Sequence, residues 1–174
     1  MKRFLLLGIT LMVSAAMLMT ACKKDETNNG NNNGGEGTEA GYVDLGLPSG
    51  TKWKSANETG GYNGLYTFDE AVSAFGDKLP TKEQLEELKN NCTWEWQNNG
   101  GYKVIGTNGN SIVLSAAGIR DCDVNVYNVG YFGYYWSSTT YDSEIAWRLD
   151  FNWEEVGVDN DFRCCGQSVR LVKK

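Results

Sequence analysis

The 174-residue chain contains no histidine, only two prolines and little positive charge. Without histidine it cannot form a Ser-His-Asp or Cys-His catalytic arrangement, a histidine-bound zinc site or the usual general base at neutral pH. Acidic residues outnumber basic ones by 22 to 16, and the sequence has no basic stripe. We therefore expect no nucleic-acid partner.

Beyond its first twenty residues the chain also lacks an apolar run of the roughly 20 residues that a membrane span needs. The N-terminus has two basic residues, an uncharged apolar stretch over residues 4–19, and Ala21 directly before Cys22. This layout is typical of a lipoprotein signal peptide that is cut before a cysteine, to which lipid is then attached. An ordinary secretory signal with an incidental cysteine is the alternative. We expect residues 1–21 to be the signal peptide and Cys22 to carry acyl chains that hold the protein at a membrane.

The segment after the lipidation site has a composition unlike that of a folded domain. Residues 23–41 are mostly Asn, Gly, Glu and Thr, with no aromatic and no branched aliphatic side chain. Such a segment cannot bury enough apolar surface to offset its ordering entropy, so residues 22–41 are predicted to be a disordered tether. The run at 23–26 (KKDE) is similar to signals that send some bacterial lipoproteins to the outer face of the outer membrane, or is simply a solvated charge run. The expected location is the outer membrane, with exposure at the cell surface left open.

The remaining 133 residues, 42–174, are enough for one domain. Removing the signal peptide takes away two positive charges, so the mature chain has 14 basic and 22 acidic residues and a net charge of −8. Two capping boxes, Thr67 with Glu70 and Thr81 with Gln84, predict the starts of two short helices. Short strands are predicted at 102–105 and 112–114 around an Asn-Gly turn, and at 134–137, 145–151, 155–158 and 168–172. This order of elements indicates an α+β fold. Side chains in these segments that we expect to be mostly buried are Trp53, Trp94, Leu114, Trp136, Leu149 and Val169.

Four cysteines lie in the domain, and their spacing contains no CxxC unit and no metal-site rhythm. Cys164 and Cys165 are adjacent, and adjacent cysteines rarely bond each other because the ring is strained. Cys92, at the end of a predicted helix, is interpreted as a small core residue. The pattern therefore favours unbonded cysteines over any disulfide, although an oxidising compartment permits one.

Several segments together closely resemble the Fibrobacter succinogenes major paralogous domain, a family that recurs in lipoproteins of gut bacteria. They are 43–53 (VDLGLPSGTKW), 79–85 (LPTKEQL), 92–96 (CTWEW), 106–112 (GTNGNSI), 116–118 (AAG), 135–139 (YWSST) and 168–172 (SVRLV). The resemblance covers essentially all of 42–174. It implies a C-type-lectin-like domain, with two short helices and a twisted, mostly antiparallel sheet beneath a loop-rich ligand face.

Residues 79–81 and 168–172 also look distantly like the formylglycine-generating enzymes, which oxidise a substrate cysteine with a cysteine pair near the C-terminus. Here Cys164 and Cys165 are adjacent, the surrounding motifs of those enzymes are missing, and the chain is short. A shared fold does not carry function. A catalytic function of this type is the alternative to a binding module, and a purely structural envelope lipoprotein is a third possibility.

Residues 119–165 have an unusual composition. Tyr, Asp, Asn, Phe and Cys, all reachable from the codon AAC by changing its adenines, fill a frame of Gly, Trp, Ser and Arg, while Lys, Gln and Met are absent. This is similar to the variable region of diversity-generating retroelement proteins, and a paralogue with Tyr- and Asn-rich loops is the alternative. Either way, Tyr and Phe offer large contact area at low entropy cost, as in antibody loops.

We therefore predict a tethered binding module with no catalytic residues, cofactor or metal, and with an unidentified protein or glycan ligand at the cell surface. The acidic loop at 159–161 has oxygen ligands that calcium accepts, but the Glu-Pro-Asn and Trp-Asn-Asp triplets of sugar-binding lectins are missing. A constant frame of Trp136, Ser138, Arg163 and Arg170 is expected beneath one exposed ligand face. The residues predicted to converge on that face are Asp121, Asp123, Tyr127, Tyr131, Phe132, Tyr134, Asp159, Asp161 and Phe162.

Overall fold

The computed structural model describes residues 38, 39 and 41–174, so the predicted signal peptide, the lipidated Cys22 and most of the tether lie outside the described residues. The described residues form an α+β architecture with two α-helices, one 3-10 helix and four sheets with antiparallel strands. The predicted α+β class, the two short helices and the antiparallel pairing are confirmed, but the strands form four sheets rather than the one that was predicted. Among the described residues, no helix has the length and apolar character to cross a membrane.

The helices are α1 (Phe68–Phe75), the 3-10 helix η1 (Gly76–Lys78) and α2 (Lys82–Asn91). Both predicted capping boxes are confirmed: the hydroxyls of Thr67 and Thr81 each accept the backbone N–H three residues further on, at 3.3 Å. Glu70 and Gln84 return the interaction by accepting the N–H of the cap residue. Each box satisfies two N–H groups that would otherwise lack a partner at a helix start.

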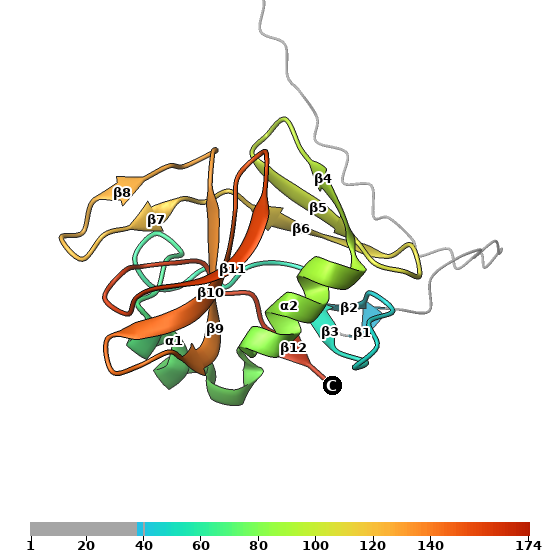
Figure 1. Cartoon of the computed structure of the whole chain (residues 1–174), viewed down its shortest axis with the longest axis horizontal. Helices are drawn as coiled ribbons and strands as arrows, with labels where there is room; N and C mark the ends of the chain where they lie inside the picture. The colour runs from blue at the N-terminus through green and yellow to red at the C-terminus, as the bar shows by residue number, and fades with distance from the viewer. Residues whose placement is uncertain (1–37, 40) are drawn as a thin grey trace, which may run out of the picture. The chain divides into compact units, whose positions relative to one another are not determined.

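Four groups of strands make up the sheets (Figure 1). The first sheet contains β1 (Thr38–Glu39), β2 (Tyr42–Asp44), β3 (Lys52–Lys54) and β12 (Val172–Lys173). The second contains β4 (Thr93–Trp96), β5 (Gly101–Ile105) and β6 (Ser111–Ser115). The third is the hairpin β7 (Ile119–Arg120) and β8 (Val126–Tyr127). The fourth contains β9 (Gly133–Thr140), β10 (Ile145–Phe151) and β11 (Val156–Phe162).

One tether prediction and one strand prediction need correction. Strand β1 lies within the predicted tether, but Thr38 and Glu39 pair with β2 of the domain. Residues 168–171 are buried but form no regular strand, and only the bridge of Ser168 to Tyr135 links them to β9. The hairpin of β5 and β6 around Gly109, which has a φ of 84°, is confirmed.

The sheet β9–β10–β11 separates two apolar cores. Tyr135 packs into the first core with α2, β2, β3, β5 and β6, while its neighbour Trp136 packs into the second core with α1 and residues 165–171. This follows from strand geometry, because successive side chains point to opposite faces. The first core also receives Leu149 and Phe151 from β10. Both faces of the sheet are therefore covered over much of its length.

The predicted core is largely confirmed. Buried residues from that prediction are Trp53, Leu114, Trp136, Leu149 and Val169. Trp94 is half-buried instead, and it packs by its ring against Tyr102 and Phe151 at the margin of the first core.

Arg170 holds the irregular 168–171 segment in place. Its guanidinium donates hydrogen bonds to the Asn57 side chain and to the backbone carbonyls of Lys54 and Val113. Burial lowers the pKa of Arg170. The side chain is only 2% exposed, so these three acceptors replace the water that an isolated guanidinium would need.

Candidate binding surface

A hairpin-based arm, residues 119–131, extends beyond the sheet β9–β10–β11 (Figure 1). Strands β7 and β8 form it, and β7 also pairs with Gly166 through two backbone hydrogen bonds of 2.9 and 2.7 Å. Gly118 begins the arm with a φ of 73°, and a Cβ there would lie 2.1 Å from the carbonyl oxygen of Tyr127. Only glycine fits this close crossing of the two chain segments.

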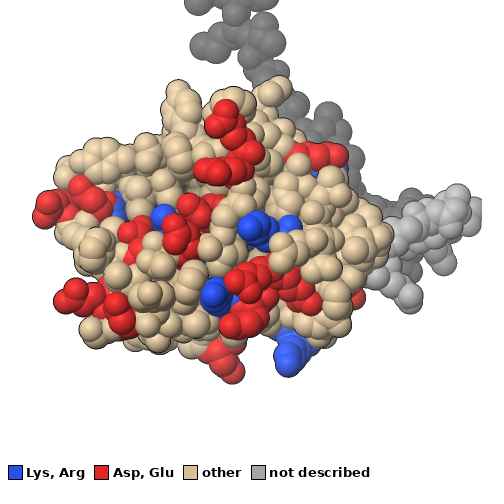
Figure 2. All heavy atoms as spheres, viewed as in Figure 1, with Lys and Arg blue, Asp and Glu red and all other residues tan. Residues whose placement is uncertain are grey.

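The arm exposes an unusual amount of apolar surface. Five of its side chains are between 36% and 69% exposed: Val124, Val126, Tyr127, Val129 and Tyr131. On the face shown in Figure 2, the arm is mostly uncharged and acidic groups gather at its outer end. Single exposed apolar residues are ordinary, but a cluster of them on one short segment is typical of an interaction surface.

The tip of the arm is organised by Asp121. Its carboxylate accepts the backbone N–H groups of Asp123 at 3.0 Å and Asn125 at 2.8 Å. These bonds, led by the one from Asn125 and joined by the Tyr127 hydroxyl, lower the pKa of Asp121. Val124 at the apex has a φ of 72°, in the left-handed region that β-branched residues rarely adopt. Holding a valine in this backbone conformation therefore lowers the stability of the folded state.

A disulfide between Cys122 and Cys164 joins this tip to the segment after β11. The prediction of unbonded cysteines is therefore wrong for these two residues. The partners are 42 positions apart, and no local motif signals a pairing that depends on how distant strands meet. Closing a loop of that length stabilises a fold by about 4 kcal/mol in the chain-entropy model.

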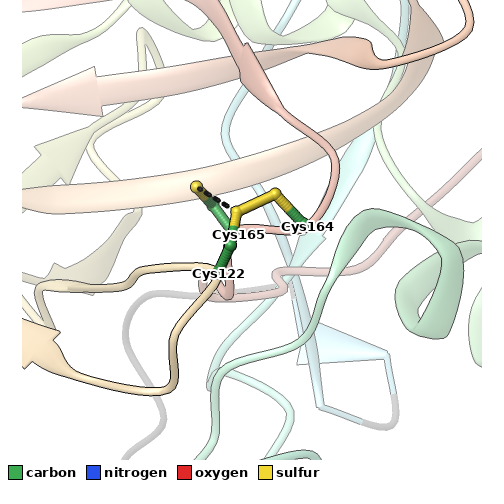
Figure 3. A group of neighbouring side chains, drawn as sticks. All are labelled: Cys122, Cys164 and Cys165. Atoms are coloured by element: carbon green, nitrogen blue, oxygen red, sulfur yellow. Dashed lines mark hydrogen bonds between the residues drawn. A yellow bond between two sulfur atoms is a disulfide. The ribbon is translucent and has the colours of Figure 1, made fainter.

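The other two cysteines of the domain are free. Cys165 is buried, and its Sγ lies 4.0 Å from that of Cys122 (Figure 3). Cys92 is half-buried against the first core, in keeping with the packing role predicted for it. Burial raises the pKa of both thiols to about 11. Among the described residues, the one grouping of three or more potential metal-ligating side chains is Cys122, Cys164 and Cys165.

Near the base of the arm, an arginine on β10 organises a group of acidic and aromatic side chains. Arg148, with its side chain 12% exposed, contacts Asp161 at 3.2 Å and Asp150 at 3.7 Å. Its guanidinium lies 4.6 Å from the ring centre of Tyr134, which stacks in parallel on Phe132 at 6.0 Å. The group therefore joins all three strands of the sheet to the end of the arm.

A cleft of about 330 Å³ lies beside this group. Phe132, Asp150, Glu155, Asp159 and Lys89 are among its lining residues. Burial raises the pKa of Asp150, the carboxylates of Asp159 and Glu155 raise it further, and Arg148 offsets part of the effect. Negative charge is therefore incompletely neutralised on this wall of the cleft.

The predicted ligand residues fall into separate groups and do not share one exposed face. Asp121, Asp123, Tyr127 and Tyr131 lie on the arm, and Phe132 and Asp159 line the cleft. Two predictions of exposure are corrected. Tyr134 is only 9% exposed because Phe132 and Arg148 pack on its ring. The carboxylate of Asp161 is largely buried because it contacts Arg148 and accepts a hydrogen bond from the Gln167 amide at 3.0 Å.

Phe162 is exposed, but it lies away from the group around Arg148. The pairing of β10 with β11 is regular from Phe151↔Val156 to Ile145↔Phe162. Side chains in such a strand alternate between the two faces of the sheet. Asp159 and Asp161 therefore project to one face, and Asn160 and Phe162 project to the other. The three oxygen-bearing side chains at 159–161 do not converge on one point.

The predicted frame residues are buried to different extents. Trp136 and Arg170 are buried, and Ser138 is half-buried beside Pro80. The guanidinium of Arg163 braces the segment after β11 by donating to the Ser143 carbonyl at 2.9 Å and by pairing with Asp69 of α1.

Two frame glycines are required by packing. A Cβ on Gly133 would lie 2.0 Å from the Phe151 ring, and one on Gly166 would lie 2.5 Å from Arg120. No ordinary side chain fits at either position, because both neighbours are themselves packed.

Sequence reasoning missed the arm valines and Arg148. Val124 and Val126 alternate with polar residues, which is the pattern of a half-buried strand, and Val129 follows after Asn128. The codons reachable from Asn favour Tyr, Asp and Phe, so the predicted ligand residues include no valine. For Arg148, a lone arginine within an apolar strand pattern was the available signal.

The comparisons with known proteins give a family and no assigned function. Residues 79–172 match the family described as a domain of unknown function (DUF8237). The match covers more than half of the chain, which therefore belongs to this family. No curated protein and no solved structure matches the chain.

Val124→Asn is expected to raise the free energy of unfolding by about 1 kcal/mol, because Asn tolerates the left-handed backbone conformation far better than valine. Urea unfolding followed by tryptophan fluorescence measures the change. The matched control is Val126→Asn in β8, where no positive φ has to be relieved. An equal gain from both substitutions would show that polarity, rather than backbone strain, is the cause.

Asp150 and Asp161 contact the same guanidinium, but replacing each by Asn is expected to change the free energy of unfolding differently. Asp161→Asn should lower the free energy of unfolding by about 2 kcal/mol, because it removes a charged partner from both Arg148 and Gln167. Asp150→Asn should cause no loss at pH 7, since its surroundings disfavour the ionised form.

The raised pKa of Asp150 also predicts how the stability of Asp150→Asn, relative to wild type, changes with pH. The folded state raises the pKa of Asp150, so this residue's contribution to stability is lost as pH rises from its unfolded pKa, near 4, through the folded value. Asp150→Asn lacks this loss, so its stability relative to wild type should increase from pH 3 to pH 7. Unfolding curves at several pH values test this, and a relative decrease would contradict the raised pKa of Asp150.

Proposed function

We propose that this member of the DUF8237 family is a lipid-tethered, extracytoplasmic binding module that binds a protein ligand through its arm. The observation that carries the proposal is the exposed apolar cluster on the arm, which is held by a disulfide and has a strained valine at its apex. Backbone strain at an exposed position contributes nothing to packing and is common at functional sites.

The chemistry of the arm favours a protein over a glycan. Three of the five exposed apolar side chains are valines, which supply aliphatic contact area and no hydrogen bonds. A sugar presents hydroxyl groups that need paired polar partners when they lose water, whereas a protein can offer complementary apolar side chains. Tyr127 and Tyr131 add the amphipathic aromatic character that is frequent in the energetic centres of protein interfaces.

The scaffold in this proposal is C-type-lectin-like. Two short helices and several antiparallel sheets pack around two cores, and residues 122–131 of the arm lie outside both cores. This division between a rigid support and an exposed loop region supports the assignment, as does the resemblance of 42–174 to the paralogous domain of gut bacteria. The binding role itself is argued from the arm, because a fold does not determine a function.

We include sequence diversification of the arm in the proposal. Residues 122–131 are all exposed, so substitutions there leave both cores intact. The positions that sterically require glycine, Gly133 and Gly166, lie outside this run. A mutagenic process that spared the frame and Cys122 and altered residues 123–131 would change the ligand without unfolding the domain.

Tyr131→Ala is expected to weaken binding to a ligand selected against wild type from a displayed peptide library by about 30-fold. This corresponds to about 2 kcal/mol for one central aromatic residue. The free energy of unfolding should be nearly unchanged, because the side chain is 69% exposed. Titration calorimetry and urea unfolding measure the two effects. The matched control is Tyr141→Ala, another exposed tyrosine, which lies in the turn between β9 and β10.

Equal loss in both tyrosine variants, or selected ligands that ignore arm substitutions, would refute the arm as the binding surface. A printed glycan array probed with the same variants provides the second test. Glycan binding that depends on Tyr131, with no peptide selected, would overturn the choice of a protein ligand.

The anchoring part of the proposal is tested with Cys22→Ala. Cells grown with radiolabelled palmitate should label the wild type and not the variant, because the thiol that receives lipid is gone. The variant should also be lost from the membrane fraction or accumulate unprocessed. A Cys92→Ser control should be labelled like wild type, and persistent labelling of Cys22→Ala would disprove lipidation at that residue.

A further inference from the structure

The three sulfur atoms at the tip of the arm form a more specific arrangement than a structural disulfide requires. The Sγ atoms of Cys122, Cys164 and Cys165 all lie within 4.8 Å of one another (Figure 3). Cys122 is bonded to Cys164, and the same Cys122 sulfur lies 4.0 Å from the thiol of Cys165. Two adjacent residues therefore compete for one disulfide partner.

The two competitors differ in accessibility. Cys164 is exposed, whereas Cys165 is buried in the second core beside Asp161, with its Sγ 4.0 Å from an oxygen of that carboxylate. The present pairing thus keeps the free thiol away from solvent. The alternative pairing would leave the free thiol on the exposed residue.

We propose that Cys122, Cys164 and Cys165 form a thiol–disulfide exchange site, in which Cys165 replaces Cys164 as the partner of Cys122 and converts Cys164 into an exposed, modifiable thiol. The Cys165 thiol gives up its proton to water, and its thiolate attacks the Sγ of Cys122. The Cys122–Cys165 bond forms as the Cys122–Cys164 bond breaks, and the departing Cys164 thiolate takes up a proton. No external oxidant or reductant is needed, because the number of disulfides is unchanged.

The ligand class of the exposed site follows from the same chemistry. A Cys164 thiolate attacks small-molecule or protein disulfides, forming a mixed disulfide and releasing one thiol of the attacked molecule. The exchange does not depend on the ligand proposed for the arm, and its failure would leave that proposal standing.

Two features make the exchange slow at neutral pH. The Sγ atoms of Cys164 and Cys165 lie within 4.8 Å, so the three sulfurs are not in line, and the Cys165 side chain must turn before it attacks along the S–S axis. Burial, together with the negative charge of Asp161, also raises the pKa of the Cys165 thiol to about 11. The attacking thiolate is therefore scarce at neutral pH. Its fraction increases about tenfold for each unit by which the pH rises toward the pKa.

Native alkylation of the full chain tests the proposal. Protein carrying Cys92→Ser is held with N-ethylmaleimide between pH 7 and pH 9, quenched in acid, digested, and mapped by fragment ions that separate residues 164 and 165. Cys164 should be alkylated progressively, about tenfold faster for each pH unit. Adding Cys165→Ser should slow this at least tenfold, because Cys122 and Cys164 are bonded to each other and the described part of the chain then has no free thiol left to attack them. Alkylation of Cys165 alone, or an unchanged rate at Cys164 in the Cys165→Ser variant, would overturn the proposal.

A second variant tests the geometry independently. In Cys164→Ser, treatment with oxidised glutathione should join Cys122 to Cys165, with a loss of two hydrogens and a crosslinked peptide. A stable glutathione adduct at Cys122 with no crosslink would show that Cys165 cannot reach its proposed partner, and would also overturn the proposal.

Discussion

The alternation of Tyr135 and Trp136 in β9 is the constraint on which the rest of the structure depends. Their rings enter different cores, so β9 and its neighbour β10 must be covered on both faces. Each ring is also fixed by a polar group. The Tyr135 hydroxyl donates to the Ser115 carbonyl at 2.9 Å, and the indole N–H of Trp136 donates to the Tyr66 carbonyl at 2.9 Å. A slip of one residue in this strand would exchange the two rings and break both sets of contacts.

The support of the arm follows from this sheet. Arg148 of β10 contacts Tyr134 and Asp161 on the two flanking strands, and its other partner, Asp150, lines the cleft. The arm itself buries little, so the hydrogen bonds of β7 to Gly166 and the disulfide to Cys164 supply much of its attachment. Its surface can therefore change with little effect on the cores, which is the separation that a binding module with a variable surface needs.

Local features of the fold were predictable from the sequence, and features that join distant segments were not. Both helix starts, the β5–β6 hairpin and the bounds of β10 follow from signals within a few residues. The division into several sheets, the ordering of β1 and the irregular path of residues 168–171 depend on pairing across the whole domain. The candidate site divides in the same way. Composition located the arm, but Tyr134 and Asp161 are buried because of Arg148, whose partners lie on neighbouring strands. The Cys122–Cys164 bond is likewise set by the position of the arm against residues 163–166.

The position of the crosslink bears on how the arm can combine a fixed path with a variable surface. The disulfide begins at Cys122, next to Asp121, whose carboxylate accepts the N–H groups of the tip loop. Together these two residues determine the path of the chain up to the apex, whatever side chains follow. Val124 shows that even a β-branched residue is held there in a left-handed conformation. A short loop without such restraints would relax away from that conformation, at a saving of the order of 1–2 kcal/mol. The restraint on the backbone therefore does not depend on which side chain stands at the apex, and in the proposed binding module this would leave the apex position open to change.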